Sequence, residues 1–142
     1  MLHVIAMVIL AQAGVRQVTR VSQDEPVYSP DGKRILWVSD VDGPGNIHVM
    51  DADGTHAQFL THGGAYDRFP VFSPDGKRIV FESNRSGHSQ LLLMNADGSD
   101  VRVLVDGGGQ MSAPRFAPDG KQVIFPRADA NKELRIFTVD VP

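Results

Sequence analysis

The stretch Ser29–Ile35, which reads Ser-Pro-Asp-Gly-Lys-Arg-Ile, decides the fold because it returns twice along the chain. The second copy, Ser73–Ile79, is identical, and the third, Ala117–Val123, reads Ala-Pro-Asp-Gly-Lys-Gln-Val. The copies begin at positions 29, 73 and 117, so the period is 44 residues. A constant period of roughly 20–50 residues is typical of solenoids, propellers and other repeat proteins. The sequence therefore predicts a repeat architecture.

A second motif keeps the same period. The segment Met50–Thr55 reads Met-Asp-Ala-Asp-Gly-Thr, and it returns 44 residues later as Met94–Ser99, Met-Asn-Ala-Asp-Gly-Ser. Both motifs have the composition of tight turns. Two turn motifs in constant phase indicate one supersecondary unit in each period.

The middle repeat is interpreted as four short antiparallel strands. Its Ser-Pro-Asp-Gly turn lies between the apolar segment Phe69–Phe72 and the β-branched and aromatic segment Arg78–Ser83, which is typical of a hairpin. After a break at Asn84–Gly87, further strands are predicted over Gln90–Met94 and Val101–Val105. No long segment has a period of 3.6 residues, so no helix is predicted.

The second strand of each repeat indicates how the repeats pack. These strands are apolar at consecutive positions, without the alternation of a strand that has one face in water. They are Ile35–Val38, Ile79–Phe81 and Val123–Phe125. Such strands are buried on both faces, as in a stack of small sheets. With a period of 44 residues, this pattern predicts an all-β fold, a β-propeller with three four-stranded antiparallel blades in each chain.

These motifs resemble a known family. The pattern Pro-x-Phe/Tyr-Ser-Pro-Asp-Gly-Lys-Arg-Ile, then Ser-Asn-Arg-x-Gly, then Met-Asn-Ala-Asp-Gly-Ser is similar to the WD40-like repeat of the TolB C-terminal propeller, over about residues 14–142. Related propellers occur in prolyl-oligopeptidase-type and tricorn-type proteases. The resemblance implies a propeller that usually has six blades. For function, it implies a periplasmic interaction protein that, in TolB, binds lipoprotein and Tol-system partners.

The predicted strands are permuted by one relative to whole blades. The blades are predicted over about residues 26–61, 70–105 and 113–142, and the third has only three strands. The segment Gly14–Thr19 resembles the fourth strand of a blade. In closed propellers, such an offset lets one terminus complete the blade that the other begins.

Three blades are too few to close a ring, since propellers have about four or more. We therefore expect a homodimer with a two-fold axis that forms a six-bladed ring, in which Gly14–Thr19 of each chain completes the third blade of the other. Two alternatives stay open: the chain is a fragment of a longer propeller, or it forms a heteromeric or open assembly.

The first thirteen residues allow two interpretations. Residues 1–13 end in Ala11-Gln12-Ala13, which suits a shortened secretory signal, whereas Leu2–Ile5 is similar to Ile47–Met50 and suits an extra strand. The chain has no cysteine and a net charge of −3 without a basic stripe. This composition argues against nucleic-acid binding and fits the periplasm and the cytoplasm equally.

No catalytic or metal-binding motif emerges from the sequence. Asp51-x-Asp53-Gly54 resembles the start of a calcium loop, but no acidic residue follows at the required spacing, and its recurrence is better explained as turn chemistry. Neither a His-Glu-x-x-His motif nor a Gly-x-Ser-x-Gly elbow is present. The run Gly107–Gly109 opens no helix and is interpreted as a flexible loop between blades. We therefore expect no cofactor and no metal.

The connections between blades are the best candidates for binding. They crowd one rim of a propeller, and they differ between repeats where the turns do not. The connections are Ser22–Glu25, Gly63–Arg68 and Gly107–Ser112. The residues predicted to bind a partner are Asp24, Glu25, Tyr66, Asp67 and Arg68.

The predicted function is a non-enzymatic, TolB-like scaffold for protein–protein interaction in the periplasm or cell envelope. The alternatives are a propeller that binds a ligand or hydrolyses a substrate through its central channel, and a fragment of a protease-associated propeller. The innermost strands at Val27-Tyr28, Val71-Phe72 and Arg115-Phe116 offer little ligand chemistry, which favours the scaffold.

Overall fold

The structure is a computed structural model that describes residues 26–41 and 43–142. The expectations for residues 1–13, for the strand Gly14–Thr19 and for the candidate residues Asp24 and Glu25 lie outside the described residues.

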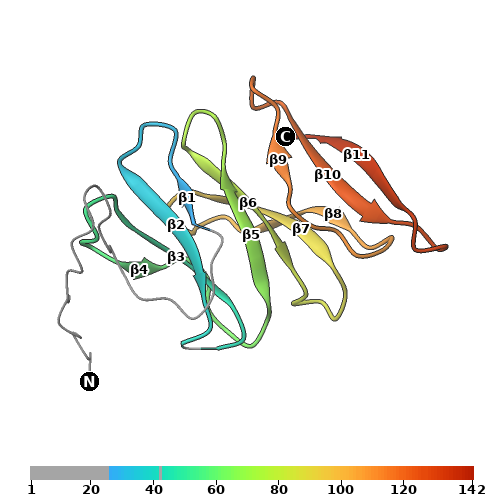
Figure 1. Cartoon of the computed structure of the whole chain (residues 1–142), viewed down its shortest axis with the longest axis horizontal. Coiled ribbons are helices and arrows are strands. Elements are labelled where there is room, and N and C mark those ends of the chain that lie inside the picture. Colours follow the sequence, from blue (N-terminus) through green and yellow to red (C-terminus); the bar gives the residue numbers. More distant parts are fainter. Residues whose placement is uncertain (1–25, 42) are drawn as a thin grey trace, which may run out of the picture.

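The described chain is built from three antiparallel sheets that stand side by side, with the second between the first and the third (Figure 1). The first sheet contains β1 (Val27–Tyr28), β2 (Arg34–Ser39), β3 (Asn46–Asp51) and β4 (Gln58–Phe59) in that order. The second contains β5 (Asp67–Phe72), β6 (Arg78–Ser83), β7 (Gln90–Asn95) and β8 (Arg102–Asp106). The third contains β9 (Arg115–Phe116), β10 (Gln122–Ala128) and β11 (Leu134–Asp140). The prediction of an all-β fold made of small antiparallel blades is confirmed.

The Ser-Pro-Asp-Gly motif, which is Ala-Pro-Asp-Gly in the third blade, forms the turn between the first two strands of each blade. In the second blade the Ser73 hydroxyl donates to Asp75 Oδ1 at 2.6 Å and accepts a hydrogen bond from the Arg78 amide at 2.9 Å. The first blade repeats both bonds with Ser29. The turn glycines Gly32, Gly76 and Gly120 have φ between 70° and 72°, a region that favours glycine. The repeated sequence thus encodes a repeated hydrogen-bonded turn.

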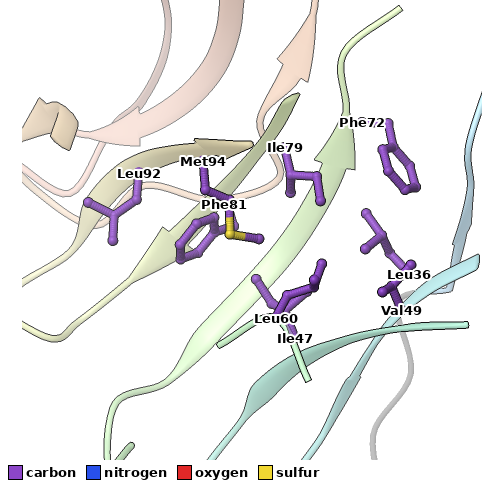
Figure 2. Close-up of a cluster of buried hydrophobic side chains, with 9 residues drawn as sticks. All are labelled: Leu36, Ile47, Val49, Leu60, Phe72, Ile79, Phe81, Leu92 and Met94. Carbon is purple, nitrogen blue, oxygen red and sulfur yellow. The ribbon is translucent and has the colours of Figure 1, made fainter. Parts of the chain in front are cut away.

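Two apolar cores hold the sheets together. One lies between the first and second blades, and Figure 2 shows its side chains converging from both sheets. It contains Leu36, Ile47, Val49, Leu60, Phe72, Ile79, Phe81, Leu92 and Met94. The other lies between the second and third blades and contains Val80, Leu91, Leu93, Met111, Val123 and Phe125. The central strands β6 and β7 therefore contribute to both cores, as their uninterrupted apolar sequences predict.

The start of β5 differs from the expectation. Asp67 and Arg68 were expected in a loop, but the structure places them in the strand, where they pair with Ser83 and Glu82 of β6. The Asp67 amide also donates to the Gly45 carbonyl of the first blade at 3.0 Å. These backbone bonds extend the strand beyond its apolar part. A bulge between Arg68 and Val71 separates the two parts.

Candidate binding cleft at the rim of the second blade

A cleft of about 600 Å³ opens where three connections meet at one end of the second blade. The chain before β5, the turn between β6 and β7, and the loop between β8 and β9 all contribute to its walls. Its polar and charged lining residues include Tyr66, Arg68, Glu82, His88, Gln110 and Ser112. We call this feature the rim cleft. Two of the three predicted binding residues that the structure describes, Tyr66 and Arg68, lie in it.

Tyr66 and Arg68 form one wall of the rim cleft. The Arg68 guanidinium carbon lies 4.8 Å from the centre of the Tyr66 ring, which is the geometry of a cation–π contact. The Tyr66 backbone is fixed by Asn84, whose side-chain oxygen accepts a hydrogen bond from the Tyr66 amide at 2.8 Å. Both side chains are exposed, and Arg68 makes no ion pair with the described residues. The pair is therefore held in place yet open to a ligand.

Asp67 has a different role from its two neighbours. Its side chain is 1% exposed and pairs with the Arg85 guanidinium at 3.1 Å. Arg85 also donates to the Ser83 hydroxyl at 3.0 Å and lies over the Phe81 ring, with 5.5 Å between its guanidinium carbon and the ring centre. Alternation along the strand turns Asp67 into the blade while Tyr66 and Arg68 face outward. The structure therefore separates Asp67 from the cleft and makes it a structural anchor.

The facing side of the rim cleft is tied by two polar networks. His88 Nε2 lies 2.7 Å from Asp106 Oδ1, and the Gln90 amide donates to the same oxygen at 2.8 Å. The hydrogen bonds from His88 and then from Gln90 hold the pKa of the Asp106 carboxyl below its usual value. In the second network, the Ser89 hydroxyl donates to Glu82 and accepts from the Met111 amide at 3.0 Å.

The glycine-rich loop packs more closely than a flexible connector would. The Ala128 amide donates to the Gln110 carbonyl at 3.1 Å, and Met111 pairs antiparallel with Arg127 of β10. A Cβ atom at Gly109, where φ is 124°, would collide with the Ala128 carbonyl oxygen. The run of glycines therefore permits the backbone of this loop to approach β10, which corrects the interpretation as a loose connection.

Phe69, which lines the rim cleft, has a strained backbone conformation. Its φ is 52°, in the left-handed region that bulky side chains avoid, and it sits in the bulge of β5. Such a conformation costs about 1–3 kcal/mol and is concentrated at functional sites. The bulge lets β5 turn both Arg68 and Phe69 toward the cleft. Sequence periodicity gives no signal for a bulge, so this feature was missed.

His88, Glu82 and Ser89 were also missed as cleft residues. The signal that could have found them is topological, because the turn between the second and third strands of a blade faces the same rim as the connections between blades. His88 and Ser89 directly follow the predicted break at Asn84–Gly87. The position of this break on the same rim is therefore the signal that indicates both residues.

The Asp-x-Asp-Gly motif forms a turn. Asp53 Oδ1 accepts hydrogen bonds from the Thr55 amide at 2.9 Å and from its hydroxyl at 2.6 Å. Asp97 accepts the same two bonds from Ser99. Among residues 26–41 and 43–142, no group of three or more His, Asp or Glu side chains is placed to hold a metal ion.

Comparison with known proteins decides the family. The sequence matches the TolB beta propeller domain over residues 6–142. The chain belongs to this family. The resemblance inferred from the repeats is thereby confirmed. Among curated proteins, none matches the chain.

Solved propellers resemble the TolB-family chain over most of its length. A protein named as TolB from Agrobacterium tumefaciens is 30% identical with a TM-score of 0.81, and the match covers 89% of this chain and 48% of that one. TolB from Acinetobacter baumannii is 24% identical with a TM-score of 0.74, covering 90% of this chain and 33% of that one. The chain thus spans about half the length of the first and a third of the second.

Enzymes also occur among the structural neighbours. An oligogalacturonate lyase in complex with manganese is 17% identical with a TM-score of 0.63, over 89% of this chain and 38% of that one. At such an identity the likeness reports on the fold alone. Within the described residues no helix is long and apolar enough to cross a membrane.

Proposed function

We propose that this chain is a non-enzymatic TolB-like scaffold that binds a protein partner through the rim cleft, in the cell envelope. The observation that carries the proposal is the Tyr66–Arg68 pair, which is fixed by its backbone but exposed at the cleft. Membership of the TolB propeller family supports a scaffold role. Because the chain covers only part of its relatives, their partners are not carried over.

The chemistry of the cleft fits a short protein segment. Tyr and Arg are enriched among the residues that dominate protein–protein binding energy, because both combine a large apolar surface with directed hydrogen bonds. The Arg68 guanidinium can form an ion pair with a carboxylate, and Phe69 offers an apolar surface beside it. We therefore expect the partner to present an acidic side chain next to an apolar one.

The cell envelope is proposed from the family. The resemblance to TolB implies a periplasmic location, and similarity to the solved TolB structures makes that compartment the first place to search. Fractionation of the native cells, followed by detection of the chain, tests this location. Recovery in the periplasmic or membrane-associated fraction supports it, and recovery in the cytoplasmic fraction alone contradicts it.

A pull-down from envelope extract tests the binding role. The tagged wild-type chain is compared with Tyr66→Ala, Arg68→Ala and the control Arg102→Ala, whose side chain is exposed on β8 outside the cleft. We expect one protein to be retained by the wild type and the control and reduced tenfold or more by both cleft variants. Equal retention by all four chains, with unchanged thermal melting, would rule out the cleft as the binding site.

A further inference from the structure

The loop Gly107–Ser112, which we call the glycine loop, carries backbone N–H groups that no described residue uses. The amides of Gly108, Gly109 and Gln110 donate to no acceptor among the residues that the structure describes. Gly108 and Gly109 have φ of 85° and 124°, a conformation that is readily available only to glycine. All three residues line the rim cleft. Successive free N–H groups in a turn form a concave site that favours anions.

A half-buried cation lies directly behind the glycine loop. The Arg127 Nη1 atom lies 2.9 Å from the point where a Cβ atom at Gly108 would be. The Arg127 guanidinium carbon lies 3.9 Å from the centre of the Phe137 ring, which holds the side chain in this position. Arg127 makes no ion pair with the described residues. Its charge therefore raises the electrostatic potential around Gly108 and favours an anion there.

The acidic side chains near the rim cleft are bonded elsewhere. Glu82 accepts a hydrogen bond from the Ser89 hydroxyl at 2.8 Å. Asp106 is hydrogen-bonded to His88 and Gln90. Neither carboxylate accepts a hydrogen bond from the amides of the glycine loop. The anion that complements these amides and Arg127 must therefore come from a ligand.

The glycine loop also closes one end of the rim cleft. On one side the Met111 amide donates to the Ser89 hydroxyl at 3.0 Å. On the other side Met111 pairs antiparallel with Arg127 of β10, and its side chain is fully buried. A peptide segment that enters the cleft from the rim cannot pass beneath a loop that is tied on both sides. Such a segment ends at the loop.

We infer that the glycine loop binds the C-terminal carboxylate of the partner segment. The inference rests on the proposed function, in which an acidic side chain of the same segment pairs with Arg68 and an apolar one packs on Phe69. The chain end adds a second anion, which accepts hydrogen bonds from the loop amides beside Arg127. Backbone N–H nests capture chain-terminal carboxylates in this way. The partner that fits the cleft is thus a protein whose last residues include an acidic and an apolar side chain.

Two tripeptides that differ only at the chain end test the inference. Both are acetylated and read Ala-Asp-Leu, but one ends in a carboxylate and the other in an amide. Binding is followed by NMR through the backbone amide signals of the isotope-labelled chain. We expect the free acid to bind about tenfold more tightly than the amide and to shift the signals of Gly108, Gly109 and Gln110. Equal affinities, or loop signals that the free acid does not move, overturn the inference.

Two variants separate this inference from the proposed function. Arg127→Met keeps an unbranched side chain over Phe137 but removes the charge, so it should reduce the advantage of the free acid by about threefold or more. Arg68→Ala should weaken both peptides by the same factor, because both carry the acidic side chain. The control Arg102→Ala, exposed on β8 outside the cleft, should match the wild type. An unchanged advantage in Arg127→Met contradicts the inference alone, whereas no effect of Arg68→Ala contradicts the proposed function.

Discussion

At the scale of single residues, burial divides neighbouring side chains into different roles. Tyr66 and Arg68 reach the rim cleft, while Asp67 between them is buried against Arg85. All three residue types suit binding, so composition alone could not separate them. The strand alternation that does separate them depends on where β5 begins, and backbone bonds to Gly45 and to β6 determine that point.

Removing the Asp67 carboxylate should lower the stability of the chain without removing any residue that lines the rim cleft. Asp67→Ala leaves the Arg85 guanidinium without its buried partner, and we expect the free energy of unfolding to fall by about 1–3 kcal/mol. Urea denaturation measures this change. As a control, Arg102→Ala removes an exposed charged side chain on β8 that makes no ion pair among the described residues, and it should change stability by less than about 0.5 kcal/mol. A loss for Asp67→Ala no larger than that of the control would contradict the anchor role.

The turn serines should make stability depend on pH in the acid range. Hydrogen bonds from Ser29 and Ser73 and then from the Lys33 and Lys77 amides hold the pKa of Asp31 and Asp75 below 3.8. On acidification the unfolded chain therefore takes up these protons first. This stabilisation is present above about pH 4 and is lost as the pH falls through the folded-state pKa.

Denaturation between pH 5 and pH 2.5, roughly the window in which carboxylates titrate, measures the effect. The double variant Ser29→Ala/Ser73→Ala should lose stability less steeply on acidification than the wild type. Ser86→Ala, at an exposed position outside these turns, is the control and should follow the wild type. Identical slopes for all three chains would mean that the serine hydroxyls do not set these pKa values.

At the scale of elements, the loop Gly107–Ser112 joins the rim cleft to the third blade. Its backbone pairs with β10 through Met111 and Arg127, and the Met111 amide donates to Ser89 on the other side. The loop thus links the cleft wall to the packing between blades. Sequence reasoning predicted its position as a connection between blades, but composition could not show that the glycines permit a close approach.

Gly109→Ala should disturb this element. The added methyl group would meet the Ala128 carbonyl, and positive φ adds backbone strain, so we expect a loss of about 1–3 kcal/mol in unfolding free energy. Gly64→Ala is the matched control, because a Cβ atom there has no described atom within 4 Å. Thermal unfolding of the two variants measures the difference. Equal melting temperatures would show that the loop yields without cost.

At the scale of the whole molecule, most of the fold could be predicted from the 44-residue period. It gave the blades, their turns and their stacking, because turn chemistry and uninterrupted apolar strands are local properties that recur with the period. The candidate site was predicted only in part. Tyr66 and Arg68 were predicted because they lie in a connection between blades, whereas the bulge at Phe69 and the contacts of His88 depend on tertiary packing.

The central claim is that the rim cleft binds a protein. Photo-cross-linking in cells that produce the chain tests this claim most directly. A photoreactive phenylalanine analogue replaces Tyr66 in one variant and Val103, exposed on β8 outside the cleft, in the other. The account predicts one distinct adduct with another protein from position 66, absent at position 103 and lost when Arg68→Ala is added. The same adducts from both positions, or no adduct from position 66, would contradict it.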